Sequence, residues 1–527
     1  MINDPVVDTK YGKIRGVTHK GKYFSVCSYR GIPYAQPPVG DLRWAPPVSP
    51  KPWSGVRDCT GYGPICVQPT IGMMAEPWGT DFYYAGLPPM SEDCLYLNVT
   101  TAAESADEKR PVFLWLHGGG SDHGFSYEPE FNPEELALKG VVVVTVGHRL
   151  SAFGYMALPQ ITEAYGKSGN YILMDDMKAL EWVIENIEAF GGDPDCITVG
   201  GQSAGTAKAV TLSCTSLTKG HIRRVINDSG LCWSRDSKTL EEAYDEWAKY
   251  LTEIGINPKG SLEELRGISA ERFLPTSRKH IPGNLVVDGD IVPNVKLEDT
   301  LDLYQSELDF MSGVNLGEIA ICPGRQRTEK GFASAAEFYS YCRQILGDLY
   351  DQYHFEVLAP VTEENVDAES RRLAAYGLHT GDKMGNLAVN RRFCAYRRER
   401  ARDKGTYTYL FSRVPPCSEE EKETQRDASC LLSWHSSELW YNFASLRKDV
   451  PPARPWEKAD FQLADCMSSY WANFIKTGNP NGEGLPYWGQ GPDGFMELCE
   501  EPHMSSWNTE IHSLIEEFLE SYRVFPR

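Results

Sequence analysis

The sequence contains no apolar run long enough to cross a membrane. Its longest apolar stretches are residues 111–116 and 140–146, whereas a membrane-spanning helix needs ~18 to 20 apolar residues. It also has no long run of Lys and Arg, and its formal net charge is −21 over 527 residues. Nucleic acids and anionic membranes repel such a surface. We therefore expect neither as a partner, and predict a soluble protein that binds a small neutral or weakly polar molecule.

Targeting and cross-linking signals are also missing. Residues 1–5 lack the basic and apolar segments of a signal peptide, so we expect a cytoplasmic protein. The alternative is a secreted mature form whose leader has been removed. The 14 cysteines include no C-x-x-C pair and no His/Cys cluster with zinc spacing. This pattern predicts mostly reduced, buried thiols and no metal site.

Apolar strands alternate with helical periodicity in the first half of the chain. Continuous apolar runs of this length are typical of strands buried on both faces, and strand–helix alternation predicts a parallel sheet flanked by helices. Short strands within residues 11–26 predict a small N-terminal antiparallel sheet. With no internal repeat or low-complexity linker, we expect one α/β domain over residues 1–527. The predicted strands are 94–99, 112–116, 141–146 and 196–199, and the predicted helix is 174–190.

A G-x-S-x-G motif follows the last of these strands. It reads Gly201-Gln202-Ser203-Ala204-Gly205 and precedes an apparent helix at 207–212. In a strand–turn–helix context this motif forms a nucleophile elbow, where small flanking residues let the backbone turn sharply. The turn exposes the Ser203 hydroxyl and leaves the N–H of Ala204 facing the same space.

A glycine run follows another strand, 112–116. The sequence His117-Gly118-Gly119-Gly120 is typical of the loop that supplies the second half of an oxyanion hole. Each such donor contributes roughly 3 to 4 kcal/mol in the transition state.

A serine nucleophile needs a base and an acid, which the sequence pattern alone does not settle. His435 lies among small polar and aromatic residues that suit a loop lining a pocket, which favours it over the other histidines. Glu318 follows a predicted strand end, a usual place for the acid, but Asp288 and Glu438 remain rivals at this point. The other candidate bases are His221, His280, His354, His379, His503 and His512.

In combination, the motifs resemble the type-B carboxylesterase family, which includes cholinesterases, liver-type carboxylesterases, fungal lipases and bacterial para-nitrobenzyl esterases. The resemblance runs from about residue 12 to about residue 488. It rests on the glycine run and the elbow, together with Gly31-Ile32-Pro33-Tyr34-Ala35, Pro37-Pro38-Val39-Gly40, Ser91-Glu92-Asp93-Cys94, Phe190-Gly191-Gly192-Asp193-Pro194, Val286-Val287-Asp288-Gly289 and Gly478-Asn479-Pro480-Asn481.

The resemblance implies an α/β-hydrolase fold with a central, mostly parallel mixed sheet and helical insertions near 235–285 and 320–400 that form the gorge wall. It makes Asp288 structural and matches Cys66 and Cys94 to the family's first disulfide pair. It also implies the ion pairs Arg43–Glu92 and Arg149–Asp175, and no cofactor. The implied catalytic residues are Ser203, Glu318 and His435, and the implied oxyanion donors are the N–H groups of Gly119, Gly120 and Ala204.

Several residues depart from the family pattern. Gln202 stands where cholinesterases carry Glu, which removes a negative charge from a choline-type site. Trp78 lies too far before Cys94 to match the choline-binding Trp, and His123 falls in a segment where a bulky apolar residue is usual. We treat these three as candidate substrate-binding residues, and expect small neutral or aryl esters, including hydroxycinnamoyl (feruloyl-type) esters. The rival interpretations are a catalytically silent adhesion protein and an interfacial lipase. Oligomeric state is not predicted.

Overall fold

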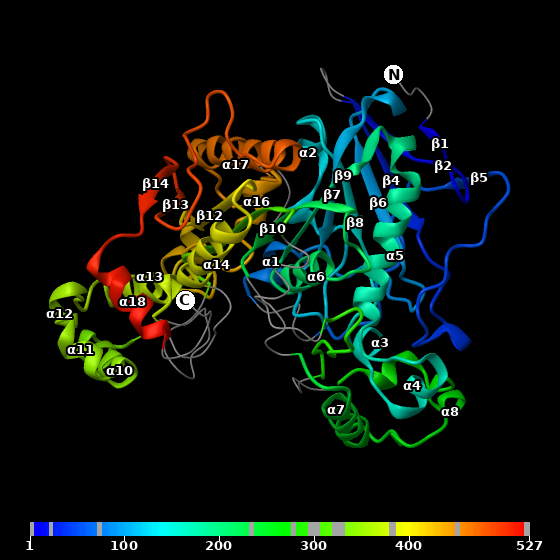
Figure 1. Ribbon diagram of the computed structural model, residues 1–527, viewed down its shortest axis with the longest axis horizontal. Coiled ribbons are helices and arrows are strands. Elements are labelled where there is room, and N and C mark those ends of the chain that lie inside the picture. The colour runs from blue at the N-terminus through cyan, green and yellow to red at the C-terminus, as the bar shows by residue number, and fades with distance from the viewer. Residues whose placement is uncertain are drawn as a thin grey trace. The chain divides into compact units, whose positions relative to one another are not determined.

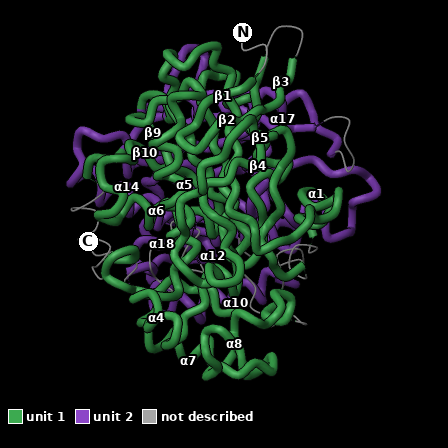
Figure 2. The backbone as a smooth tube through the Cα atoms, turned by 90° about the vertical axis from the view of Figure 1, so that its right-hand side faces the viewer, with its two compact units in different colours: residues 1–226, 233–308, 475–477 green, residues 227–232, 309–474, 478–527 purple. Residues whose placement is uncertain are grey.

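The computed structural model forms two compact units, coloured separately in Figure 2. Unit 1 comprises residues 1–226, 233–308 and 475–477, and unit 2 comprises residues 227–232, 309–474 and 478–527. The structure describes residues 5–20, 25–70, 76–230, 237–275, 281–293, 306–318, 332–378, 386–447 and 454–520.

The main strands of unit 1 pair in parallel around β7 and antiparallel from β8 to β3. Strand β7 (Arg110–Leu116) pairs in parallel with β8 (Val142–Val146) and with β9 (Gly192–Gln202). All five residues of β8 are buried, as expected for a strand covered on both faces. Beyond β8 the order continues β6-β4-β3 with antiparallel pairing. The remaining bounds are β3 Val17–Lys20, β4 Ser25–Pro33, β6 Tyr96–Thr101 and β10 Ile222–Asp228.

A small separate sheet lies at the N-terminus of unit 1. Strands β1 (Val6–Thr9) and β2 (Gly12–Arg15) are antiparallel. Of the predicted N-terminal strands only β2 belongs to this sheet, since residues 25 and 26 lie in β4 of the larger one. The third strand, β5 (Val56–Asp58), pairs with β2 in parallel. The small sheet is therefore mixed, because a strand 40 residues farther along the chain completes it, which local sequence pattern does not indicate.

Helices α5 (Tyr171–Asn186) and α6 (Ala204–Ser213) pack against each other and against β9; Figure 1 shows α5 running along the sheet. The predicted helix 174–190 corresponds to α5 and the 3₁₀ turn Ile187–Phe190, which ends at Gly191 in a left-handed conformation. The other helices of unit 1 are α1 Trp78–Asp81, α2 Glu134–Leu138, α3 Ser151–Tyr155, α4 Pro159–Tyr165, α7 Leu240–Glu253 and α8 Leu262–Arg266.

Two ion pairs join segments of unit 1 that are distant in sequence, and both predictions are confirmed. Arg43 Nε donates to Glu92 Oε2 at 2.6 Å. Arg149 makes two bonds to Asp175, through Nε at 2.8 Å and Nη2 at 2.7 Å. A charge buried to this degree must be paired to be tolerated.

The strands of unit 2 follow the order β14-β13-β12-β11. Strand β11 (Asp309–Asn315) pairs in parallel with β12 (Thr406–Phe411), which pairs in parallel with β13 (Gly494–Leu498). Strand β14 (His503–Ser506) is antiparallel to β13. Every residue of β12 is buried, so this strand lies at the centre of the unit's core.

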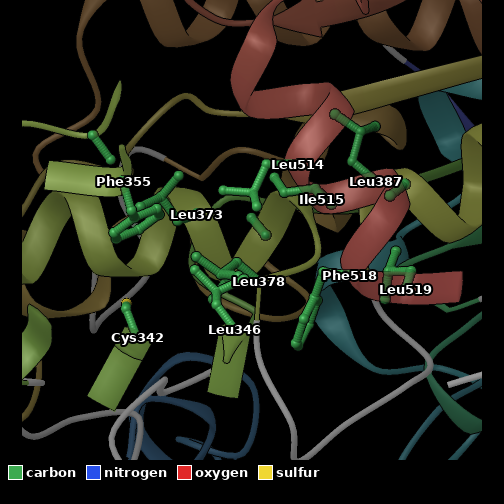
Figure 3. Packing of buried hydrophobic residues seen from close by; sticks show 14 of the residues in the cluster. Cys342, Leu346, Phe355, Leu373, Leu378, Leu387, Leu514, Ile515, Phe518 and Leu519 are labelled. Atoms are coloured by element: carbon green, nitrogen blue, oxygen red, sulfur yellow. The ribbon is translucent and has the colours of Figure 1, made fainter. Parts of the chain in front are cut away.

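Helices surround a large apolar cluster in unit 2. Figure 3 shows Leu346, Leu378 and Phe518 among the buried side chains that gather there from separate segments. The helices of this unit are α10 Ala335–Leu346, α11 Asp348–Gln352, α12 Phe355–Leu358, α13 Val366–Tyr376, α14 Leu387–Arg400, α15 Ala428–Leu431, α16 Leu439–Asn442 and α18 Glu510–Glu520, with most of α17 Lys458–Thr477.

None of the helices in the described residues combines the length and the apolar character that crossing a bilayer requires.

Candidate active site

Ser203 occupies a sharp turn between a strand and a helix in unit 1. Gln202 ends β9 and Ala204 begins α6, so the predicted strand–turn–helix context is present. Ser203 itself has φ 55° and ψ −123°, a conformation that non-glycine residues rarely adopt and that recurs at functional sites. Its side chain is partly exposed. The strained backbone thus presents a serine hydroxyl at the end of a buried strand.

The glycines on either side of Ser203 are required by close packing. A Cβ at Gly201 would lie 2.4 Å from the backbone of Gly205, and a Cβ at Gly205 would lie 2.1 Å from the carbonyl oxygen of Leu116. Both separations are far inside van der Waals contact. The two glycines of the G-x-S-x-G motif are therefore required because α6 closely approaches the end of β7.

The glycine run begins directly after β7 and packs on the serine turn. A Cβ at Gly118 would lie 2.8 Å from Gln202 Oε1 and 3.2 Å from the Ser203 Cβ. Gly119 and Gly120 have φ of 88° and 63°, which only glycine adopts readily. The loop that was predicted to bear oxyanion donors therefore lies against the predicted nucleophile within one unit.

Main-chain bonds close this loop into a tight turn. The N–H groups of Asp122 and His123 donate to the Gly119 carbonyl at 3.2 and 3.1 Å. The Asp122 carboxylate contacts His123 Nδ1. The loop's far end is fixed by buried Gln68, whose Oε1 accepts from the Gly124 N–H at 2.6 Å and whose Nε2 donates to the Gly124 carbonyl at 3.1 Å.

His435 and Glu318 form a hydrogen-bonded pair within unit 2. His435 Nδ1 contacts Glu318 Oε2, and the other carboxylate oxygen, Oε1, accepts from the Asn315 N–H at 2.9 Å. Glu318 is 3% exposed, whereas the His435 side chain is 15% exposed. The arrangement can fix the ring's tautomer and stabilise its protonated form, as a base–acid pair requires.

Hydrogen bonds connect the loop that carries His435 to the loop after β11. The N–H of Gly317 donates to the Ser433 carbonyl at 2.9 Å, and the N–H of Leu316 donates to Ser433 Oγ at 3.1 Å. A Cβ at Gly317 would lie 2.3 Å from the Leu431 carbonyl. The loop flanking His435 is strained, with φ of 52° at Leu432 and 82° at Ser436.

Both rivals for the acid have other hydrogen-bond partners. Asp288 Oδ1 accepts the N–H groups of Asp290, Ile291 and Val292 at 2.8 to 3.0 Å, which makes it a turn-forming residue of unit 1. Glu438 is fully buried and accepts from Ser229 Oγ at 2.7 Å. Burial, and then the charge of Glu318, raise the pKa of Glu438 well above its usual range.

Trp78 begins the short helix α1 in unit 1. Tyr83, shortly after it, is buried. Its ring centroid lies 6.0 Å from that of Phe125, a residue directly beyond the glycine loop.

Cys66 and Cys94 are free, buried thiols. A hydrogen bond with Cys66, and then burial, raise the pKa of the Cys94 thiol well above its usual range.

Sequence reasoning missed the residues that support the two loops. Gln68 and Asn315 act through hydrogen bonds to segments far along the chain, and no motif marks them. Lys208 was also missed, although a lysine within the otherwise apolar and small residues of α6 was a detectable signal. Within the described residues, no group of three or more His, Cys, Asp and Glu side chains is arranged to hold a metal ion.

Comparison with known proteins gives matches along nearly the whole chain. The model of the family described as "Carboxylesterase family" matches residues 3–510. A para-nitrobenzyl esterase of Bacillus subtilis is 32% identical over 487 residues, covering 91% of each chain. Neuroligin-2 of Mus musculus is 30% identical, covering 90% of this chain and 61% of its own.

Solved structures show the same relationship. A Geobacillus stearothermophilus carboxylesterase matches with a TM-score of 0.76 at 28% identity, covering 97% of this chain and 99% of its own. A para-nitrobenzyl esterase structure matches with a TM-score of 0.73 at 28% identity, covering 99% of each chain. These matches confirm the predicted α/β-hydrolase fold, with its mixed sheets flanked by helices.

Proposed function

Because the chain belongs to the carboxylesterase family, and is by that membership a carboxylic ester hydrolase, we propose that it cleaves esters through an acyl-enzyme formed on Ser203. In the first step the Ser203 hydroxyl attacks the ester carbonyl and His435 takes its proton. The tetrahedral intermediate expels the alcohol, which receives that proton from His435. In the second step a water molecule, deprotonated by His435, attacks the acyl-enzyme, and the carboxylic acid leaves as Ser203 regains its proton.

The supporting residues have distinct roles in this proposal. Glu318 orients the His435 ring through Nδ1, so that Nε2 exchanges the proton. The N–H groups of Gly119, Gly120 and Ala204 stabilise the negative charge that develops on the carbonyl oxygen. No metal or organic cofactor takes part in these steps.

The backbone conformation of Ser203 is the strongest support for the proposal. Ser203 adopts a strained backbone conformation at a strand–helix junction, with the glycine loop packed against its Cβ. Such strain persists only where the surrounding structure imposes it. A serine held this way beside a loop of positive-φ glycines suits attack on a carbonyl whose oxygen those N–H groups receive.

For the substrate, we favour a small neutral or aryl ester, with hydroxycinnamoyl esters as one candidate group. Gln202 is neutral and buried beneath Gly118, and a relative is named for para-nitrobenzyl esters. We place Gln202, His123 and Trp78 as candidate substrate-binding residues. A panel of aryl, hydroxycinnamoyl and straight-chain esters ranked by kcat/KM distinguishes these groups, and a preference for emulsified long-chain esters would instead indicate an interfacial lipase.

Replacing the nucleophile tests the mechanism. We expect Ser203→Ala to lower kcat for a short acyl ester by about 10⁴- to 10⁶-fold and to abolish labelling by a fluorophosphonate. Ser469→Ala, which removes a surface hydroxyl on α17 bonded to the Asp465 carbonyl, should leave both unchanged. Circular dichroism verifies that both variants are folded. A Ser203→Ala enzyme with wild-type rate would refute the proposal, and a folded wild-type protein inactive on every ester would favour a silent adhesion-type member.

A further inference from the structure

A buried lysine lies directly behind the glycine loop in unit 1. Lys208 is on α6, and it is only 1% exposed. Its Nζ donates to the main-chain carbonyl of His117 at 2.8 Å and bonds the Nε2 of His148 at 3.0 Å. Isolated buried ammonium groups are strongly unfavourable, so a lysine here needs specific partners.

Those partners form a chain that ends at a buried carboxylate. An ammonium group can only donate, so His148 Nε2 accepts and His148 Nδ1 carries the ring's proton. Nδ1 then donates to Asp176 Oδ1 at 2.9 Å. His148 and Asp176 are at most 1% exposed. A neutral imidazole therefore links the lysine to its counter-ion on α5.

The lysine's acceptor is the first residue of the glycine run. His117 immediately precedes Gly118, and a Cβ on Gly205 would lie 3.0 Å from the same His117 carbonyl oxygen. The His117 ring stacks on the His148 ring, with centroids 4.4 Å apart and planes inclined by 15°. Both the carbonyl and the ring of His117 are thus fixed by the Lys208–His148–Asp176 chain.

We propose that Lys208 is a positioning residue for the oxyanion loop, and that Asp176, acting through His148, sustains the lysine's charge. The charged donor holds the His117 carbonyl, and so fixes where the N–H groups of Gly119 and Gly120 point. This inference rests on the proposed role of those groups in ester hydrolysis. Hydrogen bonds from charged donors are roughly twice as strong as neutral ones, so the anchor weakens when Lys208 loses its proton.

Among the residues that the structure describes, four titratable groups face Lys208: His117 after β7, His148 after β8, Asp176 on α5 and Glu128 before the turn Pro129–Phe131. Burial lowers the pKa of Lys208 to about 8, while Asp176 and Glu128 act to raise it. Burial also raises the pKa of Asp176 to about 7, so its carboxylate is mostly charged at the pH where Lys208 loses its proton. Burial holds the pKa of His117 and of His148 well below the usual range, so both are neutral above pH 7. Rising pH therefore removes the ammonium charge, and kcat should decline above about pH 8.

The first test removes the hydrogen bond from Lys208 to the His117 carbonyl. Lys208→Met keeps the apolar stem but not the donor, and we expect kcat to fall about 10- to 100-fold, the range for a misplaced catalytic group. KM should change little, since the loss is confined to the transition state. Affinity for a trifluoromethyl ketone, which adds Ser203 Oγ and places its oxygen as an oxyanion, should weaken in parallel. Lys178→Met, on α5, removes an ammonium group that bonds Glu181 and not the glycine loop; it is the matched control and should behave as wild type.

The second test removes only the charge of the counter-ion. Asp176→Asn is isosteric and its amide oxygen still accepts from His148 Nδ1, so the hydrogen-bonded chain remains. Without the carboxylate, the lysine's proton is lost more easily and the alkaline limb of kcat should move to lower pH. Lys208→Arg, which stays charged, should remove that limb. If Lys208 had a purely structural role, the alkaline limb would stay at the wild-type pH in both variants.

The outcomes separate this inference from the proposed function. If Ser203→Ala retains activity, the acyl-enzyme proposal fails. If Ser203→Ala is inactive but folded Lys208→Met keeps wild-type kcat and ketone affinity, the positioning role alone is overturned. Should Lys208→Met not fold, an alkaline limb of Asp176→Asn at the wild-type position overturns it instead.

Discussion

The two halves of the proposed catalytic machinery are built in different ways. In unit 1, the serine turn is positioned by close backbone packing, with no room for a side chain at Gly201 or Gly205, and hydrogen bonds from Gln68 and Lys208 hold the glycine loop beside it. In unit 2, His435 and Glu318 are positioned by hydrogen bonds from residues such as Asn315. Steric positioning tolerates no added atoms, whereas hydrogen-bond positioning depends on charge and donor type. The two halves should therefore fail under different substitutions.

After loss of the nucleophile itself, the largest effect is expected where charge is removed from the hydrogen-bonded pair of His435 and Glu318. Glu318→Gln keeps the shape but places an amide against His435 Nδ1, which favours the wrong tautomer, so kcat should fall about 10³- to 10⁴-fold. The thermal unfolding midpoint should change little. Steady-state kinetics and differential scanning calorimetry measure the two quantities, with Glu399→Gln on the exposed face of α14 as control. A loss of less than tenfold would mean that Glu318 does not orient the base.

Adding one methyl group at Gly205 should disrupt the serine turn, which is positioned by steric contact. In Gly205→Ala the new Cβ meets the Leu116 carbonyl, so we expect a loss of about 1 to 3 kcal/mol in the free energy of unfolding. Displacement of the elbow should also lower kcat about 100-fold. Gly61→Ala, where a Cβ meets nothing within 4 Å, is the matched control for urea unfolding and kinetics. Equal stability of the two variants would contradict steric positioning.

The smallest effect concerns substrate charge. Gln202 is neutral, so we expect no preference for acetylcholine over an uncharged ester of similar size. The net charge of −21 can still attract cations at long range, but salt screens that attraction. The measurement compares kcat/KM for a choline ester and its uncharged isostere at low and high ionic strength. A choline preference of about tenfold, or 1.4 kcal/mol, that persists in high salt would indicate a cation site beside the elbow.

The same contrast explains which residues the sequence could predict. The elbow and the glycine loop are contiguous, because the steric demands on a turn fall on neighbouring residues; their strand and helix contexts were predicted from periodicity. Glu318 and His435 are 117 positions apart, and only the family resemblance selected Glu318 over Asp288 and Glu438. Gln68, Asn315 and the Lys208–His148–Asp176 chain were not predicted, since each depends on contacts between distant segments. The roles of Trp78 and His123 stay predictions.

Helix α5 carries two neighbouring acidic residues that face different cations. Asp175 holds Arg149, and Asp176 reaches Lys208 through His148, the residue just before Arg149. Because the two acidic residues are adjacent and each has its own partner, the helix satisfies both only at one rotation about its axis. A single-residue insertion ahead of Asp175 would turn the helix by about 100° and unpair both buried carboxylates. In a recombination or deletion library, α5 should therefore accept new residues on its outer face but keep its length.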